Sequence, residues 1–159
     1  RTLIRVTSSH PDVIVIGAGL IGCAVAHSLS RAGASVVVLD ANAPGSGASQ
    51  ASAGMLCPHI EGTHDPTLQQ LGADSLGRYD AFIARVARDS DLEVPYVREG
   101  TLQVANSDDE AARLEGIARH LHAQGVPCHF LDGPAAVLEV EPLATRHRAA
   151  LLIEPHGAV

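Results

Sequence analysis

The 159-residue sequence contains no lysine, and its 11 basic residues are all arginines scattered without a basic run. Acidic residues number 18, so the formal net charge is -7. Proteins that bind nucleic acid through its phosphates usually carry a basic patch or stripe. The sequence therefore argues against nucleic acid as a partner.

Cysteine is also scarce. Cys23, Cys57 and Cys128 form an odd set with no C-x-x-C spacing, so neither a disulfide framework nor a metal site is indicated. We expect a reducing, cytoplasmic setting. Cys23 is predicted to pack in the core as a small apolar side chain, and Cys57 and His59, which lack an identifiable partner, are assigned packing or rim positions.

Long apolar runs are absent as well. No segment approaches the ~18 uninterrupted apolar residues of a membrane span, and residues 1–11 contain no apolar core of a signal peptide. We therefore expect no membrane span and no secretion. A content of 46% hydrophobic and 18% charged residues is typical of a folded globular chain.

What the sequence does contain is a β-α-β pattern near its start. Residues 12–16 and 35–39 are β-branched, apolar runs without polar alternation, which is typical of strands buried on both faces of a parallel sheet. Residues 20–32 between them follow a helical period, and Gly33 comes where a helix C-cap is expected. The pattern predicts an α/β protein that begins with a Rossmann-like dinucleotide-binding fold and a right-handed crossover.

Three glycines join the first strand to the helix in the pattern G-x-G-x-x-G. Gly17 permits the tight turn, Gly19 has no Cβ to block a pyrophosphate, and Gly22 lets the helix pack closely. The N–H groups of the first helical turn, including those of Leu20 and Ile21, then face the anion along the helix dipole. This spacing, in this context, predicts a dinucleotide site.

Asp40 ends the second strand, 18 residues beyond Gly22. A carboxylate there can accept hydrogen bonds from an adenosine ribose, and no Arg follows to favour the extra phosphate of NADP. NAD and FAD would both suit such a residue.

Residues 41–54 favour FAD. The segment contains only small or uncharged residues, so its main chain can approach a large planar ring and its N–H groups can hold the ring's polar edge. A disordered linker has the same composition, but a linker seldom separates a half-finished sheet from its next element.

The rest of the sequence predicts a second, α+β region. We expect an amphipathic helix over residues 66–89, a helix opened by a Ser107/Glu110 capping box and closed at Gly125, a weak helix over residues 135–139, and strands over residues 94–97, 101–105, 129–131 and 149–153. The predicted domains are an FAD-binding domain at 1–89, part of an inserted substrate domain at 90–148, and a return to the FAD-binding domain at 149–159.

The sequence closely resembles the D-amino-acid oxidase family of flavoproteins in two segments, DVIVIGAGLIGCAVAHSLSRAGASVVVLD and GSGASQASAGML. The stretch SAGMLCPHIEG is most similar to the glycine oxidases of thiamine biosynthesis, although Asp40 stands where those enzymes often have Glu. Looser similarity extends through REGTLQVA, Glu141-Pro142 and Pro155-His156-Gly157. The resemblance implies these FAD-binding residues: Gly17, Gly19, Leu20, Ile21 and Gly22 at the pyrophosphate, Asp40 and Ala41 at the ribose, and Ala48, Ser49, Ala53, Gly54 and Met55 along the ribityl chain and isoalloxazine.

The resemblance also implies a function, the oxidative deamination of glycine or a small D-amino acid by hydride transfer to flavin N5. No catalytic residue is assigned. The substrate-binding Arg and a second flavin wall are expected beyond Val159, so the chain would cover less than half of such an enzyme and would be inactive alone. Homo-oligomerisation stays open.

Two alternatives stay open. The first is an FAD-dependent D-amino-acid dehydrogenase that passes electrons to a quinone. The second, from another class, is a non-catalytic nucleotide-binding remnant or subunit.

Overall fold

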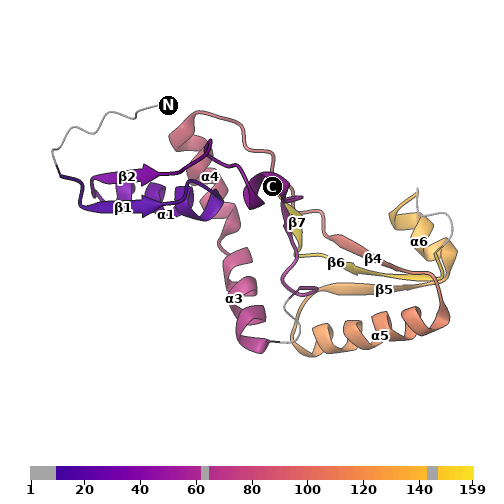
Figure 1. Cartoon of the computed structure of the whole chain (residues 1–159). Coiled ribbons are helices and arrows are strands. Elements are labelled where there is room, and N and C mark those ends of the chain that lie inside the picture. Colours follow the sequence, from indigo (N-terminus) through magenta and orange to yellow (C-terminus); the bar gives the residue numbers. More distant parts are fainter. Residues whose placement is uncertain (1–9, 62–64, 143–146) are drawn as a thin grey trace. The chain divides into compact units, whose positions relative to one another are not determined.

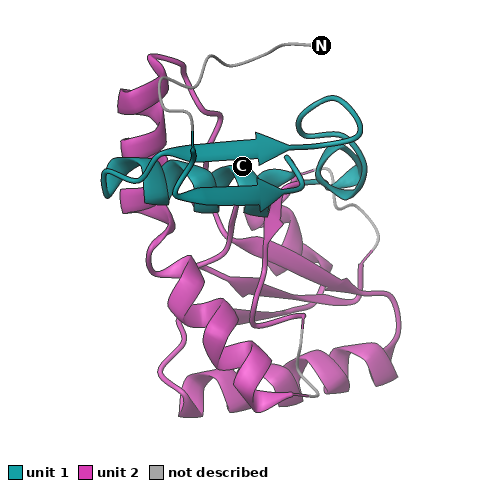
Figure 2. Ribbon diagram, turned by 60° about the vertical axis from the view of Figure 1, so that its left-hand side comes forward, with its two compact units in different colours: residues 1–53 teal, residues 54–159 magenta. Residues whose placement is uncertain are grey.

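The computed structural model describes residues 10–61, 65–142 and 147–159, and the chain divides into two compact units, residues 1–53 and 54–159 (Figure 2). Helices and strands occur in both units, so the predicted α/β class is confirmed.

The first unit contains the predicted β-α-β pattern (Figure 1). Its two strands pair in parallel, with Val13 opposite Val36 and Ile16 opposite Leu39. Gly33, at φ 93°, follows the end of the helix as expected for a C-cap. The elements of this unit are β1 (Val13–Ile16), α1 (Leu20–Arg31), β2 (Val36–Leu39) and α2 (Ala48–Ala51).

Burial in the first unit differs from the prediction. Val13 and Val15 are half-buried, whereas Ile14 and Ile16 are 56% and 88% exposed. Cys23 is exposed too, so its predicted core position is wrong. The reason is that the described part of this unit has one long helix on a two-stranded sheet, so nothing within the unit packs against the other face of the sheet or the far side of α1.

The second unit is built on a three-stranded antiparallel sheet in the order β4-β6-β5, with a separate antiparallel pair, β3-β7. Its core forms between that sheet and α5, around Leu114, Leu121, Leu151 and Ile153. The elements are β3 (Met55–Leu56), α3 (Pro66–Leu76), α4 (Tyr79–Ser90), β4 (Thr101–Ala105), α5 (Asp108–Ala123), β5 (Cys128–Asp132), α6 (Pro134–Val140), β6 (Ala149–Ile153) and β7 (Gly157–Ala158).

Two predicted elements of the second unit are wrong. The single helix expected over residues 66–89 is two helices, because the N–H groups of Gly77 and Arg78 turn back to close α3. Glycine favours such a break, since it costs about 1 kcal/mol relative to alanine inside a helix. The strand expected over residues 94–97 is reduced to one bridge at Val97, since Pro95 has no N–H to donate to a ladder.

Residues 149–159 supply the central strand β6 and the short strand β7 of the second unit. The wholly apolar sequence of β6, AALLI, suits a central position, where the strand is paired on both edges and almost completely buried. These pairings lie within residues 54–159, and the three-domain division of the whole protein stays a prediction.

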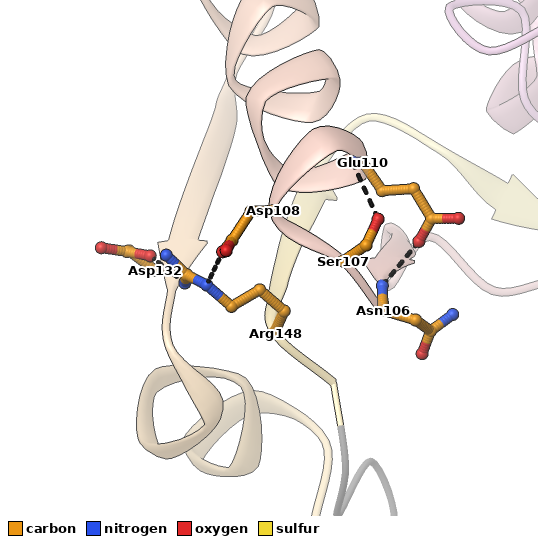
Figure 3. A network of polar contacts seen from close by, with 6 residues as sticks. All are labelled: Asn106, Ser107, Asp108, Glu110, Asp132 and Arg148. Atoms are coloured by element: carbon orange, nitrogen blue, oxygen red, sulfur yellow. Dashed lines mark hydrogen bonds and ion pairs between the residues drawn. The ribbon is translucent and has the colours of Figure 1, made fainter.

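The predicted capping box opens α5 (Figure 3). Ser107 Oγ accepts a hydrogen bond from the N–H of Glu110 at 3.2 Å, as predicted, whereas the Glu110 carboxylate accepts one at 2.6 Å from the N–H of Asn106, the residue before the N-cap, in place of the N–H of Ser107. Two donors at the helix start are thereby satisfied.

Arg148 fastens the same end of α5 to the sheet (Figure 3). Its guanidinium contacts Asp108 Oδ1 at 2.6 Å and Asp132 Oδ1 at 2.5 Å. Arg148 directly precedes β6, and its side chain therefore joins the start of β6 to the first residue of α5 and the last residue of β5.

Candidate cofactor-binding site

The turn between β1 and α1 is tight because of its glycines. Gly17 has φ 104°, which side chains rarely tolerate, and its N–H donates to Leu39 O at 2.7 Å. A Cβ on Gly22 would lie 1.9 Å from Gly17 O, so the helix approaches the turn as closely as the backbone permits. A Cβ on Gly19 would meet Ser49 Oγ at 3.1 Å.

The helix start presents unused donors. Among the described residues, the backbone N–H groups of Gly19, Ile21 and Gly22 have no hydrogen-bond partner. No acidic side chain lies in the first turn of α1. Unbonded N–H groups at the positive end of a helix dipole are suited to an anion such as a pyrophosphate.

Asp40 is held beside this turn by backbone donors. Its Oδ2 accepts from the N–H of Ala18 at 2.6 Å, and its Oδ1 accepts from the N–H of Asn42 at 2.8 Å. These hydrogen bonds, that of Ala18 first, lower the pKa of Asp40. The carboxylate is thus ionised near neutral pH, and since a carboxylate has about four lone-pair sites, it can still accept from a ribose.

A shallow, open depression of about 290 Å³ lies at the carboxyl ends of β1 and β2. Ligands of open α/β sheets bind at this end of the strands. The depression is lined by Ile16, Gly17, Leu39, Asp40 and Ala41.

The segment after Asp40 is tied to the glycine turn. Gly45 N–H donates to Ala18 O at 2.8 Å, and Ser49 Oγ accepts from the N–H of Leu20 at 2.8 Å. These two bonds hold the loop and α2 beside the start of α1, which a disordered linker would not show.

The remaining predicted residues lie in both units. Ala48 begins α2, and Ala53 is exposed at the end of the first unit. Gly54 and Met55 belong to the second unit, where Met55 is in β3 and Gly54 O accepts from Val159 N–H at 3.0 Å. It stays a prediction that these four residues and those of the glycine turn contact the same cofactor.

Ala18 is a residue that the sequence analysis missed. It is buried, its N–H binds Asp40, and its carbonyl accepts from Gly45 N–H and from Cys23 Sγ. The only signal in the sequence was its place between the first two glycines, which indicates a small residue but not these bonds.

A buried polar chain in the second unit was also missed. Cys57 Sγ lies 3.4 Å from Thr101 Oγ1, which lies 3.0 Å from His156 Nδ1, and His156 Nε2 lies 3.0 Å from His59 Nδ1. Cys57 and His59 are buried, as a packing position requires, but the expectation that they lack partners is wrong. The partners lie 44 to 97 residues apart in sequence, so no local pattern could reveal them.

Burial keeps His59 and His156, the two histidines of this hydrogen-bonded group, neutral. Desolvation lowers the pKa of His59. Desolvation first, and then repulsion from His59 when it is protonated and from Arg98, lowers the pKa of His156 to about 4. Their rings are stacked 5.1 Å apart. Protonation of His156 therefore opposes folding.

We expect this histidine pair to make the second unit less stable in acid. The unfolded chain, with an ordinary pKa near 6.5 for His156, takes up the proton before the folded chain does. The free energy of unfolding should therefore fall as the pH drops below about 6.5, by roughly 2 kcal/mol between pH 7 and pH 5.

Urea unfolding can be followed by tyrosine fluorescence, since Tyr79 and Tyr96 are both in the second unit and the chain has no Trp. His156→Gln should remove most of the pH dependence, whereas His120→Asn, at an exposed position, should keep it. An unchanged slope in His156→Gln would contradict the expectation.

The first unit fits the adenosine diphosphate half of FAD. It offers unbonded N–H groups for the pyrophosphate, an ionised carboxylate for the ribose and an open depression at the strand ends. No side chain fills the space at Gly17, where a Cβ would meet nothing within 4 Å.

Comparison with known proteins gives one family. The family model described as "FAD dependent oxidoreductase" (DAO) matches residues 12–159. Glycine oxidase from Geobacillus kaustophilus is 29% identical over 131 residues, which are 82% of this chain and 34% of that protein. A crystal structure of glycine oxidase from that organism superimposes with a TM-score of 0.87, at 28% identity, over 94% of this chain and 40% of the other.

Two further relatives are oxidases. Iminodiacetate oxidase from Chelativorans has a TM-score of 0.75 at 30% identity, over 92% of this chain and 40% of the other. 4-Methylaminobutanoate oxidase from Paenarthrobacter nicotinovorans is 30% identical over 154 residues, which are 95% of this chain and 18% of that protein. The chain thus spans well under half the length of the proteins it matches.

In the part of the chain that the structure describes, no helix has the length and apolar character needed to cross a membrane.

Proposed function

The chain belongs to the DAO family of FAD-dependent oxidoreductases, and from this membership we propose that the full-length protein oxidatively deaminates glycine or a small D-amino acid. The observation that carries the proposal is the set of unbonded N–H groups at Gly19, Ile21 and Gly22 beside the ionised Asp40. This pairing of an anion site with a ribose acceptor is what a dinucleotide cofactor requires.

Bound FAD would supply the redox chemistry by accepting a hydride at N5 from the substrate α-carbon, and the imino acid product hydrolyses to the keto acid and ammonia. The described residues would bind and orient the FAD. The turn from Gly17 to Gly22 would hold the pyrophosphate, and Asp40, with Ala41 beside it, would accept from the ribose. The small residues Ala48, Ser49, Ala53 and Gly54, with Met55, let the main chain approach the ribityl chain and ring.

The compounds after which the related oxidases are named support this substrate class. Glycine, iminodiacetate and 4-methylaminobutanoate are small amines that also carry a carboxylate. The group that would bind the carboxylate is not assigned to any residue of this chain. Cytoplasmic location and a role in thiamine biosynthesis belong to the same proposal, with glycine as the substrate.

The test is an oxidase assay on the full-length protein loaded with FAD. We expect bound flavin, its bleaching by glycine or D-alanine without oxygen, and hydrogen peroxide when oxygen is admitted. Iminodiacetate serves as the third substrate, because it separates enzymes that accept a secondary amine from those that do not.

Two outcomes would overturn the proposal. Bleaching by the amino acid with transfer of electrons to a quinone or dye, and no hydrogen peroxide, would identify a dehydrogenase. Failure to retain flavin, with no bleaching by any of the three substrates, would favour the non-catalytic alternative.

A further inference from the structure

Three chain segments that are distant in sequence meet at the buried polar chain. Cys57 directly follows β3, Thr101 is the first residue of β4, and His156 directly precedes β7. Cys57, His59 and His156 are 5%, 8% and 0% exposed, and Thr101 between them is half-buried, so water has little access to the bonds of the two histidines. A buried polar group that loses its partner carries the full cost of desolvation.

The four side chains can form their bonds in two neutral arrangements. In one, each proton points from Cys57 toward His59: the thiol donates to Thr101 Oγ1, the hydroxyl to His156 Nδ1, and His156 Nε2–H to His59 Nδ1. In the other, every donor and acceptor is reversed. Since each inner group must donate once and accept once, the bonds depend on one another, and such chains strengthen cooperatively.

The chain of bonds reaches the segment that carries Gly54 and Met55. β3 contains only two residues, and its backbone pairs with β7 through Met55 opposite Ala158 and Leu56 opposite Gly157. A pair this short is weak. Through Cys57, Thr101 and His156, side chains join the end of β3 to both β4 and the start of β7.

We propose that the Cys57–Thr101–His156–His59 chain is a positioning device, which fixes β3 so that Gly54 and Met55 are presented to the flavin in one geometry. The proposal rests on the proposed function, because it takes the flavin as the group to be faced. Thr101 and His156 are then positioning residues that act through β3.

The experiment compares Thr101→Val with Thr101→Ser in the full-length, FAD-loaded protein. Valine keeps the shape of threonine but leaves His156 Nδ1 and Cys57 Sγ without their partner, whereas serine keeps the hydroxyl. We expect Thr101→Val to weaken FAD binding roughly three- to tenfold, and to shift the flavin absorption spectrum and reduction potential. Thr101→Ser should resemble the wild type in all three measurements.

His129→Asn is the matched control, because His129 is an exposed histidine of the same unit whose side chain bonds Glu154, outside the chain of bonds. It should change neither spectrum nor potential. If Thr101→Val does not fold, Cys57→Ala and Cys57→Ser make the same comparison at the other end of the chain of bonds, with the shift expected only in alanine.

The results separate the two proposals. A wild-type protein that retains no flavin would refute the proposed function. The positioning role alone would be refuted by a different pair of results. The wild-type protein would bind flavin, and a folded Thr101→Val or Cys57→Ala variant would have the same flavin spectrum and reduction potential as the wild type.

Discussion

Gly22→Ala is expected to weaken the binding of FAD to the full-length protein about 100-fold or more, a loss of roughly 2.7 kcal/mol. The added Cβ would lie 1.9 Å from Gly17 O and 3.0 Å from Gly17 C, both backbone atoms that no side-chain rotation can move. Either α1 or the turn must shift, and the N–H groups of Ile21 and Gly22 shift with it. Titration of the apoprotein with FAD, followed by flavin fluorescence, measures the change.

Gly116→Ala is the matched control for this substitution. Gly116 is also inside a helix, but a Cβ there would meet only the end of the Arg119 side chain, at 4.0 Å. Alanine should leave FAD binding unchanged and stabilise α5 by up to about 1 kcal/mol. Equal FAD affinity in the two variants would show that the turn does not hold the cofactor.

Leu114→Ala should lower the free energy of unfolding of the second unit by about 2–5 kcal/mol, the usual cost of emptying a core leucine site. Leu114 is completely buried, on the face of α5 that packs against the three-stranded sheet. Since domains are commonly stable by only about 5–15 kcal/mol, the loss is a large fraction of the total. Urea unfolding followed by tyrosine fluorescence reports this unit.

Leu71→Ala provides the comparison. Leu71 is also helical, in α3, but it is 65% exposed, and truncation there should change the unfolding free energy by less than about 0.5 kcal/mol. A similar loss in both variants would mean that the core is not centred on α5.

The sequence predicted the parts of the fold that rest on local rules. The strands around α1, the C-cap at Gly33 and the Ser107/Glu110 capping box each depend on residues within a few positions of one another, and the structure confirms them. The G-x-G-x-x-G pattern also placed a close backbone approach at Gly22, because helix packing there requires the absence of a side chain.

The sequence could not predict what depends on pairing partners. The assumption that β1 is buried on both faces failed at Ile16, because burial depends on what covers a strand and not on the strand's own composition. His156 drew no attention for a similar reason, since its partners His59 and Thr101 are far from it along the chain. The prediction of one helix over residues 66–89 failed because a glycine that a helix tolerates and a glycine that ends a helix cannot be told apart in the sequence.

The uncovered strands of the first unit have a consequence for handling the protein. β1 and β2 form a two-stranded ladder whose outer edges are unpaired in the described part of the chain, and Ile14, Ile16 and Leu39 stand exposed on it. Apolar strands with open edges are templates for aggregation. A preparation of these 159 residues should therefore lose soluble protein with time and concentration, and its colloidal behaviour will be governed by the same strands that lead into the glycine turn.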